Sequence, residues 1–220
     1  MKRIVVKKQE KQTFGYILYL PKDYDSKKKY PLILFLHGAG ERGDGNEQLE
    51  RVNVHGVARY ANSGEFELDA IVLCPQCPEG RVWNQLVFAL CDLVDQVAEQ
   101  YGADRSRMSI TGLSMGGFGT WEMAMTYPEK FCAFAPICGG GMAWRADALK
   151  NKPIWAFHGS DDPVVSITNS EEMVRAARAN GARVTFTVFD GVGHNSWERA
   201  YTEHDIMGFL LGSSLEDAKK

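Results

Sequence analysis

A single serine lies in a setting that can turn a hydroxyl group into a nucleophile. Ser114 is the centre of the sequence G-L-S-M-G at 112–116. The apolar run at 107–111 predicts a buried strand, and 117–127 predicts a helix that stops before Pro128. The glycines allow a tight strand-to-helix turn that lifts the hydroxyl off the sheet. We therefore predict that Ser114 is a nucleophile and not an ordinary N-cap serine.

A serine hydroxyl needs a base to remove its proton, and a further group must orient that base. His194 is the preferred base among the five histidines, because it lies in a flexible loop between the last predicted strand and the last predicted helix. His37 and His158 each end a strand just before a glycine, so we interpret them as structural. His204 is expected to pack on a helix face, and His55 has no strand-end context.

Two neighbouring aspartates are candidates for the orienting acid. Asp161 and Asp162 follow the apolar run at 153–157. Both could instead be solvated turn residues, since Asp-Pro is a common turn pair. The chain order Ser114, then an aspartate, then His194 is the order expected of α/β-hydrolases. The residue types alone leave the choice between the two aspartates open.

The elements that position these residues alternate along the chain. Continuous apolar runs followed by helical patterns predict a mostly parallel sheet with helices on both faces. Ligands bind at the carboxyl ends of the strands in such sheets, which is where the candidate residues lie. We expect strands at 3–9, 13–20, 31–36, 70–74, 107–111, 131–138, 153–157 and 183–189, and helices at 47–60, 86–101, 117–127, 168–180 and 195–211.

Length and composition predict one ordinary α/β domain over 1–220. The chain is 45% hydrophobic and 24% charged, as soluble globular proteins are. Its net charge is −3 and the only dense basic block is at 27–29, so we expect no nucleic-acid partner. No stretch has the character of a signal peptide or a membrane span. We therefore expect no membrane partner, and a cytoplasmic protein unless a leader was removed, in which case a secreted or periplasmic one.

The five cysteines do not form a recognisable framework. Their odd number argues against a set of disulfides. Cys74 and Cys77 match C-x-x-C, but there is no second pair to complete a zinc site and no thioredoxin-like context. We interpret both as small buried residues at the end of a strand.

The chain resembles the serine esterases of the α/β-hydrolase fold, in the group of carboxylesterases, feruloyl esterases and polyhydroxyalkanoate depolymerase-like enzymes. Four segments carry the resemblance: L-H-G-A-G at 36–40, G-L-S-M-G-G at 112–117, H-G-S-D-D-P-V-V at 158–165 and G-H at 193–194. It implies an eight-stranded α/β-hydrolase sheet. A cap domain is not expected, because only 139–152 is available for one.

The resemblance also implies roles for individual residues. The pattern H-G-x-x-D-x-x-V places the acid at Asp162 and not at Asp161. An oxyanion-hole N–H is implied at Ala39, with Gly40 as the alternative, and Met115 supplies the second donor. The chain is thus expected to be a serine carboxylesterase that needs neither a metal nor an organic cofactor.

The substrate is expected to be a small or carbohydrate-linked ester with a short or aromatic acyl group. An aromatic wall and a polar contact could be supplied by Trp83, Trp144, Trp197, Gly40 and Arg42. The charges of Glu41, Arg42 and Asp44 are most simply those of a solvated loop. Peptide cleavage, acyl transfer and a non-catalytic binding module remain as alternatives, and the sequence does not predict the acyl length, the alcohol or the oligomeric state.

Overall fold

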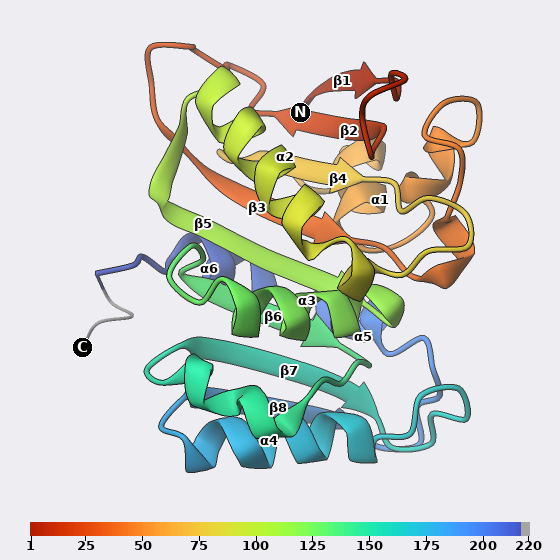
Figure 1. The fold of residues 1–220 in the computed structure, drawn as a ribbon, viewed down its shortest axis with the longest axis vertical. Helices are drawn as coiled ribbons and strands as arrows, with labels where there is room; N and C mark the ends of the chain where they lie inside the picture. Colours follow the sequence, from red (N-terminus) through yellow and green to blue (C-terminus); the bar gives the residue numbers. More distant parts are fainter. Residues whose placement is uncertain (217–220) are drawn as a thin grey trace.

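The computed structural model describes residues 1–216 and is built around one eight-stranded sheet (Figure 1). The strand order is β1-β2-β4-β3-β5-β6-β7-β8. The β1–β2 and β2–β4 pairs are antiparallel, and the remaining pairs are parallel. The strands are β1 Lys2–Val6, β2 Tyr16–Leu20, β3 Tyr30–Leu36, β4 Ile71–Pro75, β5 Ala103–Leu113, β6 Ala133–Ile137, β7 Pro153–Gly159 and β8 Arg183–Phe189. The predicted mostly parallel, eight-stranded sheet is confirmed.

Helices cover both faces of this sheet. In Figure 1, α2, α3 and α4 lie on the near face, and α1, α5 and α6 lie behind the sheet. The α-helices are α1 Gly56–Ser63, α2 Val87–Gln100, α3 Met115–Thr126, α4 Thr168–Ala179, α5 Trp197–Glu203 and α6 Ile206–Leu211. Short 3₁₀ helices are η1 Ala39–Glu41, η2 Leu49–Asn53, η3 Trp83–Gln85 and η4 Ala143–Leu149.

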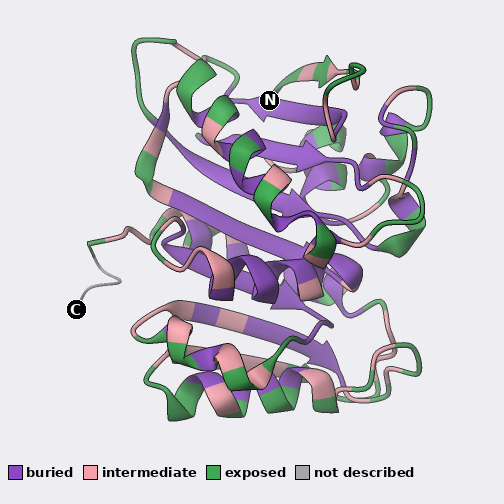
Figure 2. Ribbon diagram, viewed as in Figure 1, coloured by how far each residue is buried: buried purple, intermediate pink, exposed green. Residues whose placement is uncertain are grey.

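The central strands are buried on both sides, which explains their continuous apolar sequences (Figure 2). In β3, Leu32, Leu34 and Leu36 face the core under α2, α3 and α4. Ile33 and Phe35 alternate with them and face the core under α1, α5 and α6. Two apolar layers therefore hold the sheet rigid between the helices, and the loops at its carboxyl edge are built on a fixed base.

Two predicted helices are each divided in the structure. The stretch 47–60 forms η2 and α1, because His55 is extended and Gly56 has a φ of 61°. The stretch 195–211 forms α5 and α6, because His204 is extended and the Asp205 side chain accepts a hydrogen bond from the N–H of Gly208 at 2.8 Å. The apolar periodicity continues across both breaks, so the sequence pattern did not predict them.

His204 therefore packs differently from the prediction. Its ring lies at the junction of α5 and α6 and not on a helix face. It packs against Trp155, Phe157 and Phe189, with ring centroids 5.6 Å away in each case. The prediction that His204 is a partly buried packing residue is confirmed, but its predicted position on a helix face was wrong.

Three further expectations concern the whole of the described chain. Between β6 and β7, residues 1–216 contain only η4 and its short connections, with no inserted cap. All five cysteines are buried and free, as predicted for Cys74 and Cys77. None of the described helices combines the length and the apolar character needed to cross a membrane.

Candidate active site

Ser114 lies on a strained turn between β5 and α3. Its φ of 53° and ψ of −118° are unusual for a residue with a side chain. The turn needs glycine on both sides: a Cβ on Gly112 would lie 2.4 Å from the carbonyl oxygen of Gly116, and one on Gly116 would lie 1.9 Å from that of Leu36. Close packing against β3 thus holds the turn, and the hydroxyl is presented at the carboxyl edge of the sheet.

The structure brings Ser114, His194 and Asp162 into one hydrogen-bonded chain. The Oγ of Ser114 is 2.9 Å from Nε2 of His194. The Nδ1 of His194 is 2.7 Å from Oδ2 of Asp162. Asp162 comes from the loop after β7, and His194 from the loop between β8 and α5. Three loops at one sheet edge therefore supply a hydroxyl, an imidazole and a carboxylate in series.

The carboxylate of Asp162 is buried and surrounded by donors. Its Oδ1 accepts hydrogen bonds from the N–H groups of Val164 and Val165, both at 2.9 Å. Burial alone would raise the pKa of Asp162, but the hydrogen bond from His194 and these two N–H groups outweigh it and hold the pKa below its usual value. An ionised Asp162 only accepts, so Nδ1 of His194 carries its proton and Nε2 is left to accept from Ser114.

His158 also faces Asp162. Its Nε2 lies 2.9 Å from the carbonyl oxygen of Val165 and 3.2 Å from Oδ2 of Asp162. Both neighbours are acceptors, so this nitrogen carries the hydrogen, while Nδ1 lies 2.7 Å from the hydroxyl of Ser170. Burial lowers the pKa of His158, which favours the neutral ring. His158 thus has the structural role expected of it, and part of that role is to hold the carboxylate of Asp162 in position.

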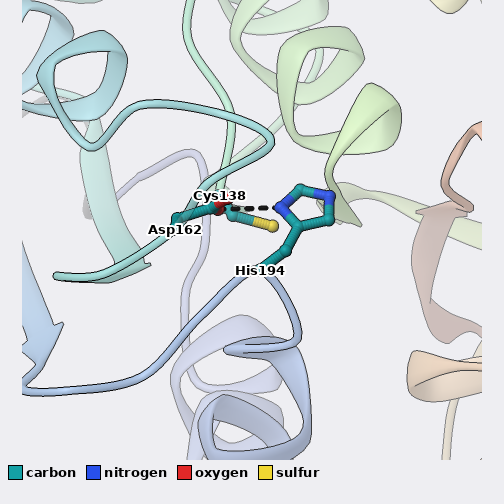
Figure 3. Close-up of side chains that lie close together, drawn as sticks. All are labelled: Cys138, Asp162 and His194. Atoms are coloured by element: carbon teal, nitrogen blue, oxygen red, sulfur yellow. Dashed lines mark hydrogen bonds and ion pairs between the residues drawn. The ribbon is translucent and has the colours of Figure 1, made fainter.

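Cys138 is a neighbour of the triad that sequence reasoning missed. Its Sγ and the ligand atoms of Asp162 and His194 lie within 4.8 Å of one another (Figure 3). Thiol, carboxylate and imidazole are all metal-binding groups, but Asp162 and His194 already share a hydrogen bond that a metal would have to replace. Burial raises the pKa of Cys138 to about 12, so the thiol stays protonated. The sequence signal that could have identified Cys138 as a neighbour of the site was its position at the end of β6.

The loop after β3 lies directly beside Ser114. A Cβ on Gly38 would be 3.7 Å from that of Ser114. His37 anchors the loop: its Nε2 accepts the N–H of Cys77 at 2.9 Å, so its Nδ1 donates to the carbonyl of Gly38 at 2.6 Å. Burial lowers the pKa of His37 to about 4, and its ring is therefore neutral.

The two predicted oxyanion-hole residues each begin a helix at this point. Ala39 is the first residue of η1, and Met115 is the first residue of α3. The N–H groups of a first helical turn have no partner within their own helix, and the helix dipole favours negative charge there. The backbone around Ser114 is therefore suited to bind an oxyanion.

A cavity of about 210 Å³ opens at Ser114. Gly40 and Trp197, two of the residues predicted to contact substrate, line it. Its full lining is Gly38, Ala39, Gly40, Glu41, His55, Leu113, Ser114, Val164, His194 and Trp197. A cavity of similar volume lies between residues 11–16 and α2, but it contains none of the three triad side chains, so volume alone does not identify the site.

The other predicted substrate contacts are not in this lining. Trp83 is fully buried and donates its Nε1–H to the carbonyl of His37 at 2.9 Å, so its expected place in an aromatic wall was wrong. Trp144 is 80% exposed on η4. A guanidinium nitrogen of Arg42 contacts the sulfur of Met115 at 3.2 Å.

The expectation that Glu41 belongs to a solvated loop was wrong. Its side chain is buried although its neighbour Asp44 is exposed. The 3₁₀ turn of η1 brings the carboxylate of Glu41 back toward Gly38 and His37. His55, which had no predicted role, lines the same cavity because the break before α1 carries it there. Neither placement follows from local sequence.

Comparisons with known proteins agree with this geometry. Residues 9–192 match the model of the Esterase family, described as "Putative esterase". A solved structure of a thermostable esterase is 33% identical, with a TM-score of 0.79, and the match covers 97% of this chain and 63% of that chain.

Two curated relatives are similar over most of this chain. "Probable feruloyl esterase C" from Aspergillus terreus is 31% identical over 72% of this chain and 58% of its own length. A bifunctional acetylxylan esterase/xylanase from Neocallimastix patriciarum is 28% identical over 67% of this chain and 22% of its own length. The chain thus spans less than two thirds of the length of either relative.

Proposed function

The chain belongs to the Esterase family, and from this premise we propose that it is a serine carboxylesterase that works through an acyl-enzyme. The resemblance predicted from sequence motifs, to carboxylesterases, feruloyl esterases and polyhydroxyalkanoate depolymerases, is confirmed at the level of the family. The observation that carries the mechanism is the chain of two hydrogen bonds from Ser114 through His194 to Asp162.

The first half of the reaction forms the acyl-enzyme. Ser114 Oγ attacks the ester carbonyl while Nε2 of His194 takes its proton. Asp162 keeps the imidazole in the required tautomer and stabilises the imidazolium that forms. The N–H groups of Ala39 and Met115 bind the oxyanion of the tetrahedral intermediate. His194 then donates its proton to the leaving alcohol.

The second half returns the enzyme to its resting state. Water loses a proton to Nε2 of His194 and attacks the acyl carbonyl. The second tetrahedral intermediate collapses, the acid is released, and Ser114 recovers its proton from His194. Side chains, backbone N–H groups and water supply every step of this mechanism.

For the substrate we propose a short-chain or aromatic acyl ester, including acyl groups on carbohydrates. Two observations support this class. Relatives of this chain are named for feruloyl and acetylxylan esters. The site itself is open, since three of the residues that line it, Ala39, Gly40 and Val164, are exposed, Val164 by 69%.

Labelling and substitution of Ser114 test the mechanism. A fluorophosphonate probe should label Ser114, and Ser114→Ala should abolish hydrolysis of p-nitrophenyl acetate while the circular dichroism spectrum stays unchanged. Ser26→Ala, at an exposed turn, is the matched control and should be labelled and active like the wild type. Labelling at another residue, or turnover retained in Ser114→Ala, would contradict the assignment.

A further inference from the structure

A buried carboxylate oxygen on the wall of the cavity has no hydrogen-bond partner. Glu41 is 8% exposed, and its Oε2 neither contacts solvent nor accepts a hydrogen bond within the described residues. An unsatisfied buried polar atom is costly, and an ionised one more so. Glu41 lines the cavity that opens at Ser114. A ligand that carries a hydrogen-bond donor could pair with this oxygen, which no group of the described residues does.

None of the neighbouring side chains neutralises this carboxylate. His37 is 3.9 Å away, but it is the neutral tautomer that donates to Gly38. The guanidinium of Arg42 contacts Met115. His55, which is partly exposed, lies 3.6 Å from Glu198 and shares that carboxylate with Arg59. Burial raises the pKa of Glu41, and His55 with the N–H groups of Gly38 and Glu41 only moderates the rise.

Two further residues that line the cavity carry a buried polar atom without a hydrogen-bond partner, His55 at Nδ1 and Trp197 at Nε1. Trp197 is 9% exposed, and its indole Nε1–H makes no hydrogen bond within the described residues. Its ring lies edge-on to that of His194, with centroids 5.3 Å apart, and 5.3 Å from the ring of His55. Two residues that line one small cavity thus carry a buried acceptor and a buried donor without partners. A hydroxyl group, which both donates and accepts, matches the pair.

The position of His194 indicates which part of the ester this cavity receives. His194 must give its proton to the leaving oxygen, so the alcohol departs on the side of its Nε2. His194 lines the cavity, together with Val164 and with Trp197, whose ring contacts that of His194. About 210 Å³ is room for a small polyol or one sugar ring and not for a long chain. The terminal torsion of a glutamate is soft, so the carboxylate can turn toward a bound group.

We propose that this cavity binds the alcohol part of the ester, and that Glu41 is a specificity-determining residue that accepts a hydrogen bond from a hydroxyl group of that alcohol. The inference rests on the proposed function and adds to it the chemistry of the leaving group. A site built to bond a hydroxyl discriminates strongly against an analogue that lacks it, because its polar group is then left unpaired.

Two acetate esters that differ only in hydroxyl groups test the proposal. Glycerol 1-acetate and n-propyl acetate share the acyl group and the length of the alcohol. The wild type should have the higher kcat/KM for glycerol 1-acetate, and Glu41→Gln should lower the ratio of the two values by about tenfold. Glu47→Gln removes a carboxylate that is 82% exposed nearby in the chain, and should leave the ratio unchanged.

Thermal unfolding checks the fold of the variant. The raised pKa means that folding favours the protonated carboxyl, so ionisation of Glu41 costs stability as the pH rises through its folded-state pKa. Glu41→Gln should therefore be at least as stable as the wild type at pH 7, and any gain should vanish at acidic pH.

Each remaining outcome is decisive. Equal kcat/KM of the wild type for both esters, or a ratio unchanged in Glu41→Gln, overturns the inference. Equal losses on both esters also overturn it and make Glu41 a residue that positions the η1 loop. If p-nitrophenyl acetate is hydrolysed through Ser114 but neither alkyl acetate is, the inference alone fails. If no Ser114-dependent hydrolysis occurs, the proposed function fails and the inference with it.

Discussion

Asp162 shows how the protein keeps a charge in a buried position beside Ser114 and His194. An ionised carboxylate out of water needs donors around it, and charge-assisted hydrogen bonds are the strongest available. The N–H groups of Val164 and Val165 occupy one oxygen, and the rings of His194 and His158 face the other. The loop after β7 therefore holds the carboxylate in one orientation, and through it the tautomer of His194.

The two adjacent aspartates should differ sharply on substitution. Asp162→Asn removes the charge that orients His194, and kcat should fall by about 10⁴-fold, as expected when the base adopts the wrong tautomer. Asp161 is exposed and accepts a hydrogen bond from the hydroxyl of Ser160 at 2.7 Å, so Asp161→Asn is the matched control and should retain most of the activity. Steady-state kinetics with p-nitrophenyl acetate would measure both.

A reversed order of the two effects would mean that the acid is Asp161, against the 2.7 Å contact between Asp162 and His194. Near-equal small effects would mean that neither aspartate supports the base. The pH dependence of stability gives an independent check. The lowered pKa of Asp162 contributes stability above its unfolded-state pKa, and that contribution is lost as the pH falls through the folded-state value. Asp162→Asn should lack this component of the acid dependence.

Local motifs predicted the residues that the structure joins in one hydrogen-bonded chain, and missed the residues that surround them. Ser114 and His194 stand in short glycine-containing segments whose strain or position is visible in the sequence. Cys138, His55 and Glu41 reach the site from separate elements, and only Cys138 has a local signal, its position at the end of a strand. Their roles depend on contacts that only the folded sheet creates.

Among the elements, the turn between β5 and α3 is the one that depends most on glycine. Gly116 lies against the end of β3, where its backbone approaches Leu36 more closely than any Cβ allows. The same approach brings the loop after β3 beside Ser114. One backbone contact thus sets the distance between Ser114 and the η1 loop. This distance depends on the absence of a side chain at Gly116.

Gly116→Ala should therefore disrupt the site and the fold together. A Cβ 1.9 Å from a backbone oxygen cannot be accommodated by a side-chain shift, so we expect a loss of about 3 kcal/mol or more and a decrease in Tm of about 10 °C. Gly40→Ala is the control, since a Cβ there meets nothing within 4 Å, and its Tm should change by about 1 °C or less. Differential scanning calorimetry would compare the two. Equal Tm values would show that the β3–α3 contact is looser than described.

Element boundaries were the least predictable part of the chain. The helix expected at 47–60 is interrupted at Gly56, and the one expected at 195–211 is interrupted at Asp205. In both places the hydrophobic pattern continues, while a positive φ at Gly56 or a side-chain N-cap at Asp205 starts a new helix. The break before α1 matters for the site, because it places His55 on the cavity wall.

At the scale of the whole molecule, the sheet order explains how distant segments form one site. β3, β5, β6, β7 and β8 are successive parallel neighbours, so their carboxyl ends share one edge. The loops after four of these strands carry the η1 helix, Ser114, Asp162 and His194. The parallel class of the sheet followed from its buried apolar runs. The strand order did not, because periodicity carries no information on which strands pair.

The open architecture predicts the acyl preference. Residues 1–216 contain no cap between β6 and β7, and the single cavity at Ser114 measures about 210 Å³. Each methylene buried by an acyl chain would contribute about 0.8 kcal/mol, but a chain lying on an open surface buries few of them. We expect kcat/KM to decrease from p-nitrophenyl butyrate to the decanoate, and no activation at a lipid–water interface. A series from acetate to decanoate below each solubility limit, followed by tributyrin across its limit, measures both.

A rise in kcat/KM toward decanoate would require an apolar acyl channel that the described residues do not provide. A jump in rate as tributyrin forms an emulsion would require a mobile cover over Ser114, and either result would refute the open-site account.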